Sequence, residues 1–257
     1  SMATNPTEPI VASTFNAELI KREGELYGED ALWAKESMCI CPGVNLHRTP
    51  YCARNHEYYS EDSVLTNLCA SAFCSGAQSK GLVTQAKHYA FNHQELNRSG
   101  LSTFLTEQAA RENELRSFQG VMQNNITSTV MTAFNRCGTV YASAYEGTLV
   151  QIARNEWGFK GAVVTDITLY WACNAYQLIK AGSDMMLDAF VYGLNFGVFL
   201  DKDTILAMDD ADRNITLYCL QNTAKHILYM VANSNAMQVP AGAKVRYSKT
   251  VEIDDEE

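Results

Sequence analysis

The apolar positions of the chain follow two different spacings, which predict strands and helices in alternation. Short, mainly apolar runs predict buried strands, which we place at residues 38–41, 82–89, 128–134, 162–165 and 184–187. Apolar residues three or four positions apart predict amphipathic helices, which we place at residues 13–35, 63–79, 106 onward, 144–156, 175–181 and 209–233. We expect a break in the first helix near Gly24 or Gly28. We expect the last helix to bury Ile215, Leu217, Leu220, Ile227, Leu228 and Val231.

The order strand, polar loop, helix repeats along the chain and predicts parallel βα units. Such units share one sheet through right-handed connections. The pattern predicts an α/β fold of the TIM-type (β/α) barrel, incomplete, with about five to six βα units where a closed barrel has eight. The chain opens on a helix, so we expect the first strands of the architecture to lie elsewhere. An incomplete barrel leaves an open sheet edge, which predicts a homo-oligomer or association with a missing segment.

Three regions are expected along the chain. Residues 1–12 are polar and contain Pro6 and Pro9, which predicts a disordered arm. Residues 13–236 hold the partial (β/α)8 barrel domain. Residues 237–257 end in an acidic run and are expected to form a solvated tail.

Composition narrows the function classes. The 257 residues carry a formal net charge of -9 and lack the clustered Lys and Arg that phosphate backbones require, which argues against nucleic acid and favours a neutral or cationic ligand. Apolar runs are too short to span a membrane. The eight cysteines show no zinc-type spacing, and several lie inside apolar runs, which predicts reduced core thiols, no metal site and a reducing, cytoplasmic location. We expect no cofactor.

Asp166 stands directly after the apolar stretch 162–165. In βα-repeat proteins the residues after each strand line one common mouth, where active sites lie. Asp is also a favoured N-cap, so this carboxylate could equally start the next helix. This stretch alone does not separate the two interpretations.

The ends of other predicted strands carry polar or aromatic residues that would meet Asp166 at the same mouth. They are Arg54 on the loop after the first strand, Lys87 and His88, and Phe134 with Asn135. Singly, Lys87 is more typical of a salt bridge and His88 of a buried core histidine. Because they stand together at successive strand ends, the set favours a functional site.

Two chemistries fit this set. In the first, Asp166 attacks the anomeric carbon of a sugar, while Arg54, Lys87 and His88 bind its hydroxyl groups. In the second, a desolvated Lys87 forms a Schiff base with a carbonyl substrate. The cluster of hydrogen-bonding groups around Lys87 favours the first.

Five motifs in order carry a resemblance to a known family. They are Pro42-Gly-Val-Asn-Leu-His-Arg-Thr-Pro50, Ala53-Arg-Asn-His-Glu-Tyr-Tyr-Ser-Glu-Asp62, Ala86-Lys-His-Tyr-Ala90 with Asn92-His-Gln-Glu-Leu-Asn-Arg98, Met131-Thr-Ala-Phe-Asn-Arg136, and Glu156-Trp-Gly-Phe-Lys-Gly-Ala-Val-Val-Thr-Asp166. Together they resemble the barrel domain of family 3 glycoside hydrolases of the β-glucosidase type. The resemblance runs from about residue 15 to about residue 187.

The resemblance implies a retaining β-glycosidase that acts on a β-glucoside or related oligosaccharide. It places Asp166 on the catalytic nucleophile, Arg54, Lys87 and His88 on residues that hold sugar hydroxyls, and Glu95 in a loop that shapes the same subsite; Phe134 lies in one of the matching motifs. Ile167 stands where the family usually has Trp. The first barrel strands and the second α/β domain, which normally supplies the acid/base carboxylate, have no counterpart here. The alternative is a non-catalytic carbohydrate-binding or assembly fragment.

Overall fold

The computed structural model describes residues 5–167, 173–187 and 200–237. Its centre is a parallel sheet in the order β1 (Met38–Cys39), β2 (Val83–Tyr89), β4 (Thr129–Thr132) and β7 (Ala162–Val164). A parallel bridge from Val164 to Met185 adds a further position beyond β7, where the last strand was predicted. Sequential strands are therefore neighbours joined by crossover connections, which confirms the predicted α/β class and the incomplete barrel.

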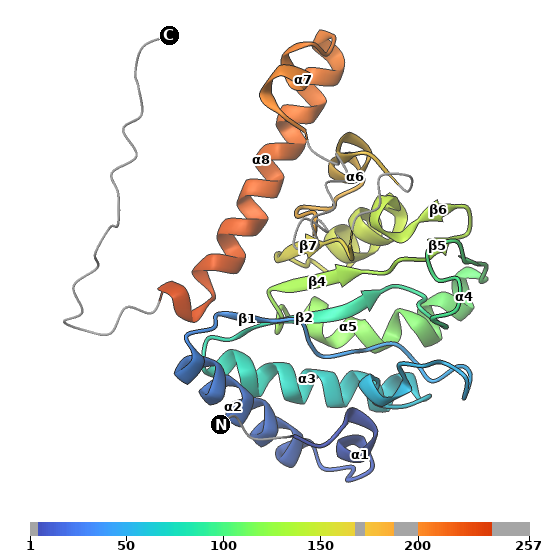
Figure 1. The fold of residues 1–257 in the computed structure, drawn as a ribbon, viewed down its shortest axis with the longest axis vertical. Coiled ribbons are helices and arrows are strands. Elements are labelled where there is room, and N and C mark those ends of the chain that lie inside the picture. Colours follow the sequence, from blue (N-terminus) through green and yellow to red (C-terminus); the bar gives the residue numbers. More distant parts are fainter. Residues whose placement is uncertain (1–4, 168–172, 188–199, 238–257) are drawn as a thin grey trace, which may run out of the picture.

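Helices cover one side of this sheet, where α2 (Ala17–Ala34), α3 (Ser63–Ser79) and α5 (Arg116–Gln123) stack below the strands in Figure 1. A short α4 (Glu107–Ala109) leads through a π-helical segment (Ala110–Glu114) into α5, and a second π-helix (Gly147–Glu156) precedes β7. Side chains on the helix side of the strands, such as Ala86, Val130 and Val163, join Phe118 and Leu149 in one buried core. The core thus sits between sheet and helices, and leaves the strand ends free for a site.

Two glycines bring α2 and α3 unusually close together. A Cβ built on Gly24 would collide with the carbonyl oxygen of Phe73, and one on Gly76 would collide with that of Lys21. The expected break near Gly24 or Gly28 is therefore wrong, because α2 is continuous and its glycines face a neighbouring helix. Their role is close packing, which only a residue without a side chain allows here.

The N-terminal region differs from the prediction. Residues 8–12 form the helix α1 (Glu8–Ala12), whose Val11 and Ala12 are buried, inside the segment expected to be disordered. α1 packs against the 3-10 turn Asn55–Glu57 of the long loop, a contact that local composition does not reveal. α2 then begins after Asn16, not Ser13, because the Asn16 side chain accepts the backbone N–H of Leu19.

The long helix α8 (Asp210–Ala232) is also not buried as expected. Ile215, Leu217 and Leu228 are exposed, and Thr216 is the buried residue of this helix. In Figure 1 the helix runs along the margin of the fold, from α6 (Ala175–Lys180) to the lower end of the sheet. Two hydrogen bonds connect it to the rest of the fold at separate points: the Tyr176 hydroxyl donates to Asp212, and the His226 ring bonds to Asp184. A helix that touches its neighbours along a narrow strip leaves most of its apolar residues outside.

The remaining described elements are short. A three-stranded sheet of β3 (Ser102–Thr103), β5 (Arg136–Cys137) and β6 (Val140–Tyr141) lies beside the main sheet. The 3-10 turns Ala142–Ala144 and Asn235–Met237 and the helix α7 (Lys202–Leu206) complete the set. Among the described residues, no helix has both the length and the apolar character needed to cross a membrane. The predicted acidic tail lies outside the described residues except for Met237.

Candidate functional site

The site lies where the strands end. β2 carries Lys87 and His88 near its C-terminal end, and Asp166 follows β7 two positions along the sheet. Gly43 forms bridges with both Lys87 and Tyr58, so the loop after β1 is held against β2 and brings Arg54 to the same mouth. The convergence predicted from strand order is therefore found.

Glu57 organises the cations of this mouth. Its two carboxylate oxygens accept hydrogen bonds from Nε and Nη2 of Arg54, each at 2.9 Å, and one of them lies 3.2 Å from Nζ of Lys87. Burial alone would raise the pKa of Glu57, but Arg54 and Lys87 hold it at about 2. Glu57 is thus ionised and fixes the heads of both basic side chains.

Glu95 organises a second group. Its carboxylate lies 2.9 Å from Nη1 of Arg98, 3.8 Å from Nη1 of Arg54 and 3.2 Å from the side-chain nitrogen of Asn92. The guanidinium of Arg98 lies over the ring of Phe134, 4.4 Å from its centroid. Phe134 therefore supports Arg98. We did not single out Arg98 from the sequence, although its spacing of three residues from Glu95 was a usable signal for an ion pair.

His88 is buried and firmly placed. Its backbone N–H donates to Oδ1 of Asn45 at 2.7 Å, and its carbonyl accepts from the same side chain at 2.9 Å. The ring lies between Tyr58, whose hydroxyl is 3.5 Å from Nδ1, and Asp166, whose Oδ2 is 3.7 Å from Nε2. Burial, reinforced by three nearby cations, holds the pKa of His88 well below its ordinary value. The ring is therefore neutral at pH 7 and does not form an ion pair with Asp166.

Asp166 is a largely buried carboxylate, 12% exposed at its side chain, whose Oδ1 accepts the backbone N–H of Ile167 at 2.8 Å. Burial raises its pKa above the ordinary value, although that N–H and the fields of Arg98, Arg54 and Lys87 act in the opposite direction. The N-cap of α6, the next described helix, is Asn174. The geometry at Asp166 is that of a carboxylate available for chemistry, not that of the cap of a described helix.

The arrangement favours one of the two chemistries considered. Lys87 forms an ion pair with Glu57, whereas a Schiff-base lysine lies in a desolvated, apolar setting. The remaining groups are donors and acceptors around a carboxylate, which suits a neutral ligand rich in hydroxyls. Within the described ranges, no group of three or more His, Cys, Asp or Glu side chains is placed to hold a metal ion.

A second buried carboxylate stands behind the mouth. Glu114 lies at the end of the first π-helix, where its Oε1 accepts from Nε of Arg48 at 2.6 Å and its Oε2 lies 3.0 Å from Nε2 of His93. Burial would raise the pKa of Glu114, but His93 and Arg48 lower it. Arg48 and His93 belong to the two loops that carry Arg54 and Glu95, so this carboxylate ties both loops to the helix layer.

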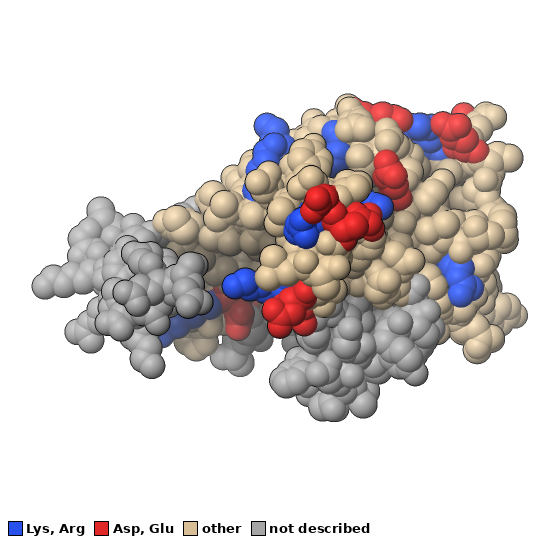
Figure 2. All heavy atoms as spheres, turned by 90° about the horizontal axis from the view of Figure 1, so that it is seen from above, with Lys and Arg blue, Asp and Glu red and all other residues tan. Residues whose placement is uncertain are grey.

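On the face shown in Figure 2, most basic side chains lie beside acidic ones and do not form a continuous patch. Arg48, Arg54 and Lys87 each have a carboxylate partner. Cations that are already paired offer little to a phosphate backbone.

Comparison with known proteins places these features in context. A model of the Glycosyl hydrolase family 3 N terminal domain matches residues 2–200. Beta-glucosidase A of Butyrivibrio fibrisolvens is 33% identical over 183 residues, which are 71% of this chain and 22% of that protein. A beta-glucosidase of Rhizobium radiobacter is 29% identical over 233 residues, 91% of this chain and 27% of that protein. The chain therefore spans about a quarter of the length of these relatives.

Solved structures show the same likeness. The structure of beta-glucosidase 3B from Thermotoga neapolitana in complex with glucose matches with a TM-score of 0.81 and 34% identity, covering 91% of this chain and 32% of that one. The GH3 beta-glucosidase of Bifidobacterium adolescentis matches with a TM-score of 0.79 and 28% identity, covering 90% of this chain and 32% of that one.

Proposed function

The chain belongs to glycosyl hydrolase family 3, whose N-terminal domain is a TIM-type barrel, and from this premise we propose that it carries the nucleophile of a retaining β-glycosidase. The relatives named above are β-glucosidases, which supports terminal β-linked glucosyl units as the substrate. Because the chain spans only part of their length, the acid/base group is assigned to a region outside this chain.

In this proposal Asp166 acts by covalent catalysis. An oxygen of its carboxylate attacks the anomeric carbon, the bond to the glycosidic oxygen breaks, and the leaving group takes a proton from the outside acid. Water then attacks the anomeric carbon while the outside group, now deprotonated, takes the water's proton; the ester bond breaks, which restores the Asp166 carboxylate and releases the sugar. A carboxylate that accepts one backbone N–H keeps lone pairs available for the attack.

The other predicted residues bind the sugar. Arg54 and Lys87 keep donors free beyond those that Glu57 engages, and His88 presents a neutral ring next to the nucleophile. Glu95 offers acceptor oxygens on the neighbouring loop, and Phe134 acts through the guanidinium of Arg98. In this proposal the sugar hydroxyls are bound by side chains that already form ion pairs, and these ion pairs fix their positions before the substrate binds.

One observation carries the proposal: Asp166 is largely buried at a strand end with a backbone donor and a neutral imidazole beside it, while Glu57 holds two of the nearby cations. The test is to incubate the chain with 2-deoxy-2-fluoro-β-glucosyl fluoride, whose fluoride leaves without a strong acid, and to measure intact mass. We expect one added sugar, absent in Asp166→Asn and retained in the control Glu61→Gln, which alters an exposed carboxylate.

Peptide mapping would locate the sugar. An adduct on another residue would contradict the role of Asp166. Absence of any adduct, together with measurable binding of methyl β-glucoside, would favour the non-catalytic carbohydrate-binding protein.

A further inference from the structure

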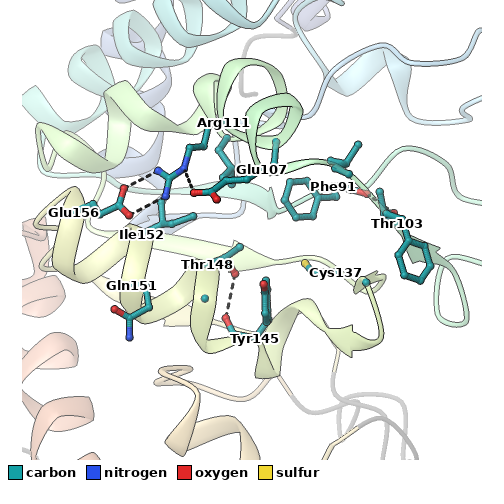
Figure 3. Close-up of a pocket in the computed structure, with 16 residues that line it drawn as sticks. Phe91, Thr103, Glu107, Arg111, Cys137, Tyr145, Thr148, Gln151, Ile152 and Glu156 are labelled. Carbon is teal, nitrogen blue, oxygen red and sulfur yellow. Dashed lines mark hydrogen bonds and ion pairs between the residues drawn. The ribbon is translucent and has the colours of Figure 1, made fainter.

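A cavity of about 430 Å³ lies away from the strand-end mouth, between the segment that starts at α4 and the second π-helix (Figure 3). None of Arg54, Lys87, His88 and Asp166 lines it. Its size falls in the range of roughly 300–1,000 Å³ that is typical of small-molecule sites. The cavity is therefore large enough for a ligand of its own.

The polar wall of this cavity is a three-residue ion cluster. Nε of Arg111 donates to Glu107 at 2.9 Å, and its Nη1 and Nη2 donate to the two oxygens of Glu156 at 2.7 and 2.9 Å (Figure 3). The cluster has two carboxylates and one guanidinium, so its net charge is negative, which disfavours an anionic ligand. Arg111 retains unused N–H groups, and Glu107 retains an oxygen, so the wall can both donate and accept hydrogen bonds.

The rest of the lining is mainly apolar or aromatic, with Thr103, Thr148 and Gln151 as further polar residues. Phe91, Leu115 and Cys137 are buried lining residues, which we call the floor, whereas Phe104 is 72% exposed and Tyr145 is 38% exposed. Exposed aromatic faces provide flat apolar surface for a ligand that has both an apolar face and polar edges.

We propose that this cavity, which we call the lateral cavity, is a second saccharide-binding site that holds a neutral pyranose unit without cleaving it. A pyranose ring has C–H faces that pack on Phe104 and Tyr145, and equatorial hydroxyls that suit the fixed fork of Arg111 and its two carboxylates. Each carboxylate forms an ion pair with the guanidinium, so the cluster is assigned to binding and not to bond cleavage. The choice of a sugar among neutral ligands rests on the proposed function, but the lateral cavity itself does not depend on Asp166.

The lateral cavity is also linked to the mouth through the backbone. Phe91, on its floor, immediately precedes Asn92 in the loop that holds Glu95, and its carbonyl accepts from the Thr103 hydroxyl at 3.4 Å. A sugar on this floor would therefore contact the base of the loop that shapes the mouth. We expect the lateral cavity to hold a neighbouring unit or a second molecule of the saccharide that reaches Asp166.

The test uses a methyl β-glucoside that carries a diazirine, photolysed with the chain and mapped by peptide mass spectrometry. We expect labels in two places, on the peptides around the mouth and on those spanning residues 103–111 and 145–156. Phe104→Ala removes an exposed ring and should not affect folding, and we expect it to weaken lateral labelling about 5- to 10-fold. Gln151→Ala serves as a second lateral variant, and Gln221→Ala, on the exposed side of α8, as the control.

Labelling confined to the mouth, or lateral labelling that neither Phe104→Ala nor Gln151→Ala reduces, would overturn the proposal. Failure of the proposed function is recognised separately, because the fluoride reagent would then leave Asp166 unmodified whether or not the lateral peptides are labelled. An Asp166→Asn variant that keeps its lateral label would show that the lateral cavity is independent of the mouth.

Discussion

Two carboxylates with little exposure to solvent, Glu114 and Asp166, lie near the loops of the mouth and have different partners. Glu114 is 2% exposed and has a basic or imidazole partner on each oxygen, Arg48 on one and His93 on the other. Asp166 accepts one backbone N–H and faces a neutral imidazole. Their pKa values move in opposite directions: burial raises that of Asp166, whereas His93 and Arg48 overcome burial and lower that of Glu114.

The difference in partners indicates which carboxylate has a structural role and which one is suited to catalysis. A buried charge that is fully paired stabilises the geometry around it, and breaking the pair leaves an uncompensated charge. A largely buried carboxylate that forms no salt bridge with a described Lys or Arg, as at Asp166, is costly to keep ionised, and such groups gather at functional sites. The contrast supports the proposed roles, in which Glu114 holds the loops in place and Asp166 reacts.

The largest effect is expected from Asp166→Asn. An amide cannot form the glycosyl ester, so turnover by a protein that contains this chain together with its acid/base region should fall by more than about 1,000-fold. Thermal unfolding of the chain should show unchanged or higher stability, because the substitution removes a carboxylate that burial disfavours. A substantial loss of stability with retained turnover would reverse the assignment.

Glu114→Gln should show the reverse pattern. It replaces a buried carboxylate that accepts from Arg48 and lies beside His93, both of which reach solvent, and we expect a loss of about 2 kcal/mol in the free energy of unfolding. Urea unfolding followed by circular dichroism measures this loss. Folded Glu114→Gln should still react with the fluoride reagent, only more slowly, since the nucleophile is intact. Glu112→Gln, an exposed change in the same π-helix, is the matched control.

The sequence predicts the strands and helices better than it predicts the ion pairs of the site. Apolar periodicity places β2, β4, β7 and α3 within one or two residues, because burial on two faces of a sheet leaves a strong local pattern. Asp166, Lys87 and His88 are found as strand-end residues because strand order fixes which ends meet.

The partners of those residues depend on the paths of loops, which local sequence does not determine. Glu57 and Glu114 were not singled out, although each organises two basic or imidazole groups, and Glu114 reaches Arg48 across 66 residues. Two predictions are wrong for a related reason. Leu228 on α8 was expected to be buried and is exposed, and Val11 in α1 was expected to be disordered and is buried in a helix. Which face of an amphipathic helix is covered is decided by tertiary contacts that composition does not record.

The pH dependence of stability should separate the two carboxylates by sign. For Glu114 the folded pKa is lowered, so its stabilisation is present above the unfolded value of about 4.3 and is lost as the pH falls through the folded pKa. For Asp166 the folded pKa is raised, so its ionisation destabilises at neutral pH and this cost disappears as the pH falls toward about 3.9.

Unfolding free energies of the wild type and both variants between pH 8 and 4 test this directly. The deficit of Glu114→Gln should be constant near neutral pH and begin to shrink only at the acid end. Any advantage of Asp166→Asn should be largest at pH 8 and should decrease toward pH 4. Expressed as variant minus wild type, the unfolding free energy should rise toward zero for Glu114→Gln and fall toward zero for Asp166→Asn as the pH decreases, and two signed differences that change in the same direction would contradict the opposite pKa shifts.

The smallest effect is expected from Tyr58→Phe, which removes a hydroxyl beside His88, the neutral imidazole next to Asp166. The Tyr58 hydroxyl accepts from the side chain of Asn92 at 3.0 Å and lies 3.5 Å from Nδ1 of His88. Its loss leaves one donor of Asn92 without this acceptor and should cost about 1 kcal/mol of stability. His88 keeps both backbone hydrogen bonds to Asn45, so the ring stays in place.

Because burial and nearby cations, not this hydroxyl, keep His88 neutral, Asp166 should remain without a charged partner in Tyr58→Phe. Formation of the fluorosugar adduct should slow by less than about 10-fold, the loss of one hydrogen bond to a positioning group. Tyr51→Phe, which alters an exposed ring on the same loop, provides the reference rate. A loss in Tyr58→Phe as large as in Asp166→Asn would mean that the hydroxyl takes part in the reaction, and the division between supporting and reacting groups would then have to include it.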